Sequence, residues 1–169
     1  MDFAIEPALQ AYLDELDAFI EAEIKPLELA DDNIRFFDHR REHARTDWDN
    51  QGLPREEWEA LLKQATRKAD AAGHWRFSAP KKYGGQDGSN LWMAVIREHF
   101  AAKGLGLHND LQNEHSIVGN FPFVEMFEQF ATSEAQKQEF ILGGFEGKRR
   151  TAFGLTEPDH GSDATHMET

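Results

Sequence analysis

The chain has 169 residues, 40% of them hydrophobic, and its 13 phenylalanines and 4 tryptophans supply a core that excludes a disordered chain. Its formal charge of −13 argues against nucleic acid and against an anionic membrane surface, because both attract clustered Lys and Arg. The absence of cysteine excludes disulfides, thiolate metal sites and a cysteine nucleophile. No stretch approaches the roughly 20 apolar residues of a membrane helix, and the acidic first residues do not resemble a signal peptide. We therefore expect a cytoplasmic protein with no membrane insertion.

The first predicted helix spans residues 7–24. An apolar stripe at steps of three and four residues indicates it, made of Leu9, Leu13, Leu16 and Ile20. We expect Pro26 to end this helix or to lie just beyond its end, because proline has no backbone N–H to donate. Residues 34–52 mix charge with aromatic rings and predict a short helix followed by an exposed loop.

Two further helices are predicted in the middle of the chain. One begins near residue 53, with Pro54 in its first turn, buries Trp58, Leu61, Leu62 and Ala65, and stops at Gly73. The glycine-rich segment 78–90 predicts a loop. The other helix spans 91–103, turns Val95, Ile96 and Phe100 inward, and ends at Gly104.

The remaining sequence changes character at residue 148. Residues 104–130 predict a buried helix with a break near 119–122, and Ser133 with Gln136 predicts a capping box that opens the next helix. Residues 149–158 read as a strand followed by a glycine turn. The predicted fold class is therefore mainly α: a helical domain over 1–148 and the first strand of a β-domain over 149–169. A lone strand needs a sheet, so we expect the chain to be incomplete.

The segment 151–163, TAFGLTEPDHGSD, carries the clearest chemistry. A strand offers a row of backbone N–H and C=O groups that suits the hydrogen-bonding edge of a planar heterocycle. Thr156 adds a hydroxyl, Pro158 turns the chain out of the sheet, and Gly161 permits a left-handed or closely approached backbone. Ser162 then offers an N–H and a hydroxyl to an anion such as phosphate. The alternative is a strand followed by an ordinary glycine turn.

The same segment resembles a motif of the acyl-CoA dehydrogenase family, written T-E-P-x-x-G-S-D, which is matched in full. KKYGG resembles the family's P-x-x-Y-G-G loop, and LDAFIEAEIKPLE resembles its first helix. The helix with E-x-Q-K that leads through a glycine to the TEP strand is also similar to the family pattern. The resemblance covers essentially the whole chain.

The resemblance implies a fold and an activity. In this family a helical first domain packs against a middle β-domain and a carboxy-terminal four-helix bundle, and the parent protein is expected to be a homo-oligomer. FAD takes part in α,β-dehydrogenation of an acyl-CoA thioester, and electrons pass to an electron-transferring flavoprotein. The family's catalytic glutamate belongs to the carboxy-terminal bundle, so no catalytic residue is assigned here and the chain alone is expected to be inactive.

The resemblance also assigns roles to single residues. The cofactor-binding residues it implies are Phe153, Leu155, Thr156, Gly161 and Ser162. Ser162 is also the implied substrate contact, reaching a phosphate of the cofactor or of acyl-CoA, and residues 109–122 are expected to influence acyl choice. Many relatives have tyrosine in place of Phe153 and a small pair in place of Asp159-His160.

Two rival functions remain. His39 to His43 spell H-x-x-E-H, an inverted zinc-protease signature, with Glu98, Glu114 and His115 as possible third ligands. Five-residue matches arise readily by chance, and a solvated helix face explains the same residues, so no metal site is assigned. The second rival is a non-enzymatic helical interaction module derived from the dehydrogenase scaffold.

Overall fold

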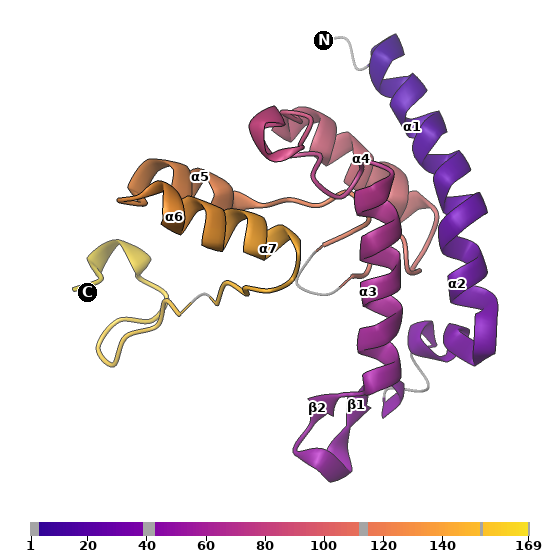
Figure 1. Ribbon diagram of the computed structural model, residues 1–169. Helices are drawn as coiled ribbons and strands as arrows, with labels where there is room; N and C mark the ends of the chain where they lie inside the picture. The colour runs from indigo at the N-terminus through magenta and orange to yellow at the C-terminus, as the bar shows by residue number, and fades with distance from the viewer. Residues whose placement is uncertain (1–3, 39–42, 112–114, 153, 169) are drawn as a thin grey trace. The chain divides into compact units, whose positions relative to one another are not determined.

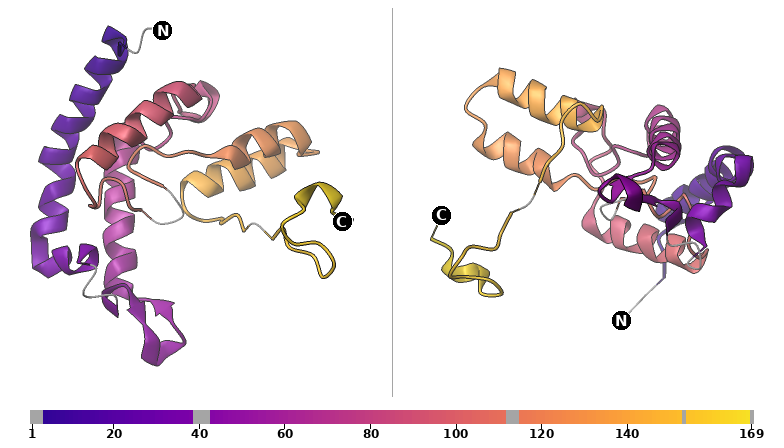
Figure 2. Two further views of the ribbon diagram at one scale, coloured as in Figure 1. Left: turned by 180° about the vertical axis from the view of Figure 1, so that it is seen from behind. Right: turned by 90° about the horizontal axis from the view of Figure 1, so that it is seen from below.

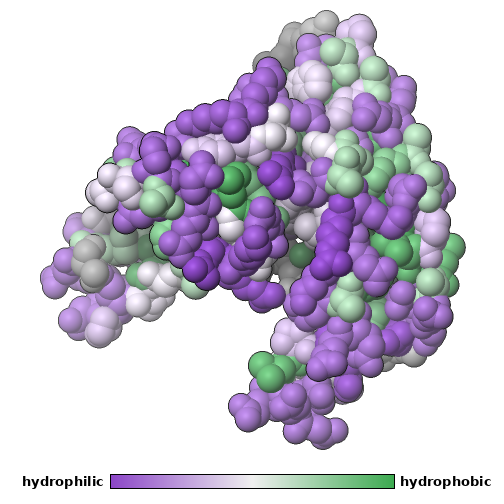
Figure 3. All heavy atoms as spheres, in the orientation of Figure 1, coloured by the Kyte–Doolittle hydropathy of each residue, from purple (hydrophilic) through white to green (hydrophobic). Residues whose placement is uncertain are grey.

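The computed structural model describes residues 4–38, 43–111, 115–152 and 154–168, and it is mainly helical (Figures 1 and 2). The chain divides into two compact units, Met1–Phe121 and Pro122–Thr169. Each unit is built around its own buried apolar side chains. Hydrophilic residues cover most of the face drawn in Figure 3, which fits the high charge of the chain.

The first helix is longer than predicted, and Pro26 does not end it. It consists of three parts: α1 (Pro7–Phe19), a wide π-type turn (Ile20–Ile24) and α2 (Lys25–Leu29). In the wide turn the N–H of Lys25 donates to the carbonyl of Ile20, five residues back. Because Pro26 follows this turn as one of the first residues of α2, its missing N–H does not interrupt the helix. The predicted apolar stripe is confirmed, since Leu9, Leu13, Leu16 and Ile20 are all buried.

A small hairpin replaces part of the predicted exposed loop. After a 3₁₀ helix (Ala30–Phe37), the antiparallel strands β1 (Thr46–Asp47) and β2 (Leu53–Pro54) are joined through a 3₁₀ turn (Trp48–Asn50). Pro54 therefore lies in β2, ahead of the helix, and not in the helix's first turn.

Helices α3 (Glu56–Ala71) and α4 (Asn90–Ala102) confirm the two middle predictions. The four residues predicted to form the buried face of α3 are buried, and Ala69 extends that face. On α4, Ile96 and Phe100 are buried as predicted, but Met93 takes the inward place expected for Val95, which is half-buried. The side chain of Ser89 accepts a hydrogen bond from the N–H of Trp92 at 3.2 Å and caps α4.

The loop between α3 and α4 requires glycine at two close contacts. It contains a 3₁₀ turn (Lys81–Tyr83). A Cβ on Gly85 would lie 1.9 Å from the carbonyl oxygen of Ala79, and one on Gly88 would lie 2.2 Å from the ring of Phe77. Any side chain at either position would displace backbone or core, so this loop depends on glycine for its shape.

The helix predicted over 104–118 is wrong for the described residues, which form a buried irregular loop. Leu107, Leu111 and Ile117 fill the core from this loop. Its backbone is paired without a helix, because the N–H of Ile117 donates to the carbonyl of His108 at 3.0 Å and the N–H of Leu111 to that of His115 at 2.9 Å.

The second unit is a helical hairpin followed by an irregular segment. Its helical parts are α5 (Pro122–Phe130), α6 (Glu134–Lys137), a π-type turn (Gln138–Leu142) and α7 (Gly143–Phe145). The rings of Phe127 and Phe140 stack with centroids 5.0 Å apart. Ser133 caps α6 by accepting from the N–H of Gln136 at 3.3 Å, whereas the Gln136 side chain accepts from the N–H of Thr132 rather than completing the predicted capping box.

No strand forms among the described residues of 149–168, where only a short 3₁₀ turn (Ala164–His166) is regular. A strand needs a neighbour to take up its backbone groups, and the two described strands pair only with each other. The predicted boundary between residues 148 and 149 stays a prediction. Within the described residues, no helix combines the length and apolarity needed to cross a membrane.

Replacing Ile96 with alanine tests the core of the first unit. Ile96 is fully buried on α4, and we expect Ile96→Ala to lower the free energy of unfolding by about 2–5 kcal/mol through lost burial and a residual cavity. Leu91 on the same helix is 71% exposed, so Leu91→Ala is the matched control. Urea titration followed by circular dichroism measures both. Equal losses in the two variants would contradict the packing described.

Candidate functional site

The segment 151–163 is built around a closed turn. The N–H of Glu157 donates to the carbonyl of His160 at 2.9 Å, and the N–H of His160 donates to that of Glu157 at 3.3 Å. Pro158 and Asp159 form the tip of this turn, and the N–H of Glu168 donates to the Glu157 carboxylate at 2.9 Å. Thr156 and Gly161 therefore lie directly before and directly after a pinned turn.

A second local network follows the motif. The hydroxyl of Thr165 donates to Asp163 at 2.6 Å, and His166 also hydrogen-bonds that carboxylate. These bonds, first from Thr165 and then from His166, lower the pKa of the Asp163 carboxyl below its ordinary value. Asp163 thus remains ionised and fixes the short 3₁₀ turn that comes after the motif.

The residues assigned to cofactor binding are exposed or half-buried where the structure describes them. Phe153 lies outside the described residues. Leu155 is half-buried, and Thr156, Gly161 and Ser162 are exposed. Leu155, Thr156 and Ser162 make no hydrogen bond with another described residue. Gly161 has neither a positive φ nor a close neighbour at its Cβ position.

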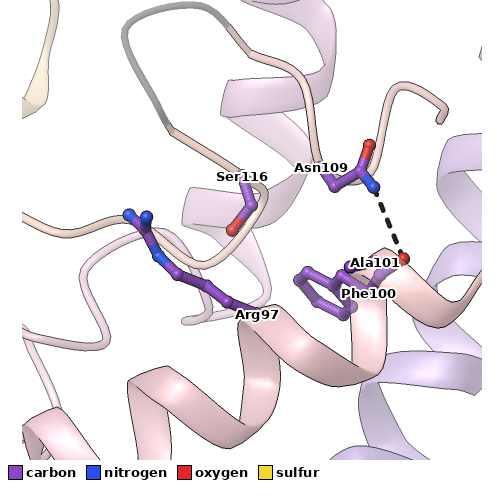
Figure 4. A pocket seen from close by; sticks show the side chains of 5 residues that line it. All are labelled: Arg97, Phe100, Ala101, Asn109 and Ser116. Carbon is purple, nitrogen blue, oxygen red and sulfur yellow. Dashed lines mark hydrogen bonds between the residues drawn. The ribbon is translucent and has the colours of Figure 1, made fainter. Parts of the chain in front are cut away.

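A separate pocket in the first unit lies between α4 and the buried loop (Figure 4). Its volume is about 250 Å³, and its lining residues are Arg97, Phe100, Ala101, Asn109 and Ser116. Asn109 and Ser116 belong to the segment 109–122 that was predicted to influence acyl choice. Arg97 was not singled out from the sequence. Arg97 lies one turn before Phe100 on an otherwise apolar face of α4. A charged residue in that position is the sequence signal that could have indicated a pocket there.

Asn109 fixes the wall of this pocket. Its side-chain N–H groups donate to the carbonyls of Gly104 at 2.9 Å and Phe100 at 3.4 Å, and its oxygen accepts from the N–H of Gly106 at 3.1 Å. One side-chain amide therefore supplies hydrogen-bond partners to backbone groups at the end of α4 and at the start of the buried loop. Figure 4 shows the bond to Phe100 across the pocket's edge.

Two buried polar side chains support the loop from inside. The Ser116 hydroxyl donates to the carbonyl of Val118 at 2.8 Å and accepts from its N–H at 3.1 Å. His108 lies 3.2 Å from the carbonyl of Phe100 through Nε2. Burial lowers the pKa of His108, so its ring stays neutral at neutral pH.

The zinc hypothesis gains no support from the described part of the chain. Residues 39–42 of the H-x-x-E-H match, and the candidate ligand Glu114, lie outside the described residues. His43 is exposed, with its ring 6.2 Å from that of Trp48, and His115 packs against Trp75 and Phe121. Among the residues that the structure describes, no group of three or more His, Asp or Glu side chains is placed to hold a metal ion.

Comparison with known proteins points to one family. The chain is 32% identical over 103 residues to a probable acyl-CoA dehydrogenase of Bacillus subtilis, covering 61% of this chain and 16% of that protein. It is 36% identical over 92 residues to the short-chain-specific acyl-CoA dehydrogenase of Megasphaera elsdenii, covering 53% and 22%. It is 30% identical over 97 residues to a subunit of the caffeyl-CoA reductase–Etf complex of Acetobacterium woodii, covering 57% and 24%.

These matches define the class: the chain is similar to proteins of the acyl-CoA dehydrogenase family, as the TEP-x-x-GSD motif predicted. The matched stretches span between 16% and 27% of the length of the curated relatives. No family model and no solved structure matches the chain significantly. The similarity is thus to part of these longer proteins, at a level typical of distant relatives.

Replacing Asn109 tests the pocket wall. Asn109→Ala removes three hydrogen bonds at the junction of α4 and the loop. We expect the free energy of unfolding to fall by about 1–3 kcal/mol, because the carbonyl of Gly104 and the N–H of Gly106 lose the Asn109 amide as a partner. The control is Asn90→Ala, which removes the same kind of side chain from an exposed position on α4. Thermal unfolding measures both, and a neutral Asn109→Ala variant would show that the amide does not hold the loop.

Proposed function

We propose that the chain forms the helical and flavin-contacting part of an FAD-dependent acyl-CoA dehydrogenase. The observation that carries the proposal is the full TEP-x-x-GSD match, joined to curated relatives of that family over 53–63% of the chain. The substrate is an acyl-CoA thioester that loses hydrogens from its α and β carbons. When bound, the flavin supplies the oxidant for this reaction, and an electron-transferring flavoprotein takes up the electrons.

In this proposal the flavin's pyrimidine edge is lined by backbone groups of Phe153 and Leu155 and by the side chain of Thr156. The donor set fits that group, because Leu155 offers a backbone N–H and C=O, Thr156 offers a hydroxyl, and neither residue uses these groups on another described residue. Donors fixed beside the pyrimidine edge stabilise negative charge there without reorganising. Phe153 supplies an aromatic ring to the same site.

The pinned turn separates two contacts of different chemistry. Residues before it, 154–156, present backbone and hydroxyl groups in sequence. Residues after it, Gly161 and Ser162, are exposed and present an N–H and a hydroxyl suited to a phosphate of the cofactor or of acyl-CoA. Because hydrogen bonds between Glu157 and His160 hold the two parts together, a ligand that meets both gains from a preformed spacing.

The rest of the active site lies outside this chain in our proposal. The catalytic carboxylate that removes the α-proton belongs to a carboxy-terminal part, so the chain by itself is inactive. We also propose that the whole enzyme is a homo-oligomer. The pocket bordered by Asn109 and Ser116 contributes to acyl selection. The named substrates of the relatives differ from one another, so we assign no particular acyl group.

Removing the two hydroxyls tests the proposed contacts. In the intact enzyme we expect Thr156→Ala and Ser162→Ala each to raise the dissociation constant for FAD by about 2- to 10-fold, the range that corresponds to one lost hydrogen bond. Flavin fluorescence during dilution or dialysis measures the loss. Thr165→Ala is the control, because the Thr165 hydroxyl donates to Asp163 within the chain. Flavin retention that is unchanged in both variants would contradict the assignment.

A further inference from the structure

We propose that His74 and Tyr12 form a proton-sensitive latch that holds the amino-terminal half of α1 against the end of α3. The latch is independent of the proposed dehydrogenase chemistry. Figures 1 and 2 show α1 at the outer edge of its unit.

The contact between these residues is buried and polar. His74 is 2% exposed, and its Nδ1 lies 3.1 Å from the Tyr12 hydroxyl. The amide of Gln86 approaches the same hydroxyl at 3.5 Å and donates to the carbonyl of Gly73 at 2.8 Å. Because Gln86 acts as a donor there, the Tyr12 hydroxyl is free to donate to Nδ1. This arrangement requires a neutral His74 ring with an unprotonated Nδ1.

His74 is attached firmly to α3, so the latch joins two separate elements. The backbone N–H groups of His74 and Trp75 donate to the carbonyl of Ala69 at 2.9 and 3.1 Å. On the other side, α1 encloses the ring with Tyr12 and with Phe19, whose ring meets it edge-on at 4.9 Å. Tyr12 also stacks on Phe77 with ring centroids 5.4 Å apart.

The charged groups around His74 would stabilise a protonated, positively charged ring only weakly. On α1, Glu15 lies 3.9 Å from Nε2, but its side chain is 62% exposed and screened by water. On α3 and the loop after it, Asp70 and Arg76 pair with each other at 2.7 Å. Burial therefore outweighs the attraction of Glu15 and lowers the pKa of His74 below its ordinary value.

The direction of the pH effect follows from this lowered pKa. Above about pH 6.5 the ring is neutral whether α1 is docked or released, so docking does not depend on pH. Below about pH 6.5 the released state binds a proton first, and docking weakens about tenfold per pH unit until the lower pKa of the docked state is reached. Protonation also turns Nδ1 into a donor, which deprives the Tyr12 hydroxyl of its acceptor.

The carboxy-terminal half of α1 has a different attachment. Asp17 accepts hydrogen bonds from His99 on α4 at 2.7 Å and from Lys103, the residue directly after α4, at 2.9 Å. Burial alone would raise the pKa of Asp17, but the bonds from Lys103 and His99 outweigh burial and bring the pKa below its ordinary value. The carboxylate therefore stays ionised in mild acid. Acid should therefore release residues 7–16 while residues 17–24 remain attached.

Hydrogen exchange of the intact chain at pH 7.5, 6.5 and 5.5, corrected for intrinsic rates, tests the latch. We expect the protection factors of residues 9–16 to fall by up to about fivefold between pH 6.5 and pH 5.5, and those of residues 17–24 to stay constant. His74→Gln should abolish the pH dependence, and His108→Gln should keep it. A uniform fall along the chain, or a pH dependence that persists in His74→Gln, would overturn the proposal.

Glu15→Gln provides a second test that does not disturb the core. Its carboxylate favours the charged His74 ring in the docked state, so removing it should lower the docked pKa further. The onset of release near pH 6.5 should stay the same, while the weakening of docking of residues 9–16 should continue to lower pH and end in a larger total loss. This variant keeps the buried contacts intact because Glu15 lies at the surface. A release profile identical to that of the unmodified chain would contradict the role given to His74.

Discussion

Backbone hydrogen-bonding groups must find partners, and the way in which this chain satisfies them determines both its fold and its candidate site. The helices pair their own groups. The buried loop after α4 cannot, so Asn109 and Ser116 pair several of them through side-chain contacts. Among the described residues, 154–156 make no such hydrogen bonds, and Gly154 and Thr156 are exposed while Leu155 is half-buried. The need for backbone hydrogen-bond partners therefore accounts for the buried, paired loop in the first unit and for the unpaired segment 154–156 in the second.

This constraint links structure to function in the motif. A segment with exposed N–H, C=O and hydroxyl groups is suited to a ligand or a neighbouring sheet, and the adjoining turn is pinned by its own bonds between Glu157 and His160. In the proposed enzyme residues 154–156 and the pinned turn would meet the same cofactor at different points. The pocket beside α4 would then contribute to binding of the acyl group through a wall that Asn109 already holds in place.

Much of the helical architecture could be predicted from sequence because burial leaves a periodic trace. The stripe from Leu9 to Ile20 and the buried face of α3 are examples, and both are confirmed. Pro26 was misread because a wide turn before it removes the need for its N–H, which no local pattern announces. The loop around Leu107 was misread as a helix because its apolar residues are equally buried, whereas its hydrogen bonds depend on contacts distant in sequence. The flavin contacts rest on a motif whose ligand lies outside the chain, so the fold alone does not test them.

The central claim is that this chain serves a flavin-dependent dehydrogenase, and the visible absorption spectrum of the purified intact protein, recorded together with its mass, tests it most directly. The account predicts a mass well above 19.3 kDa, flavin absorption bands, and bleaching of those bands on addition of an acyl-CoA thioester. A colourless protein of 19.3 kDa that binds a protein partner and leaves acyl-CoA unchanged would contradict it. That result would instead identify a helical interaction module derived from the dehydrogenase scaffold.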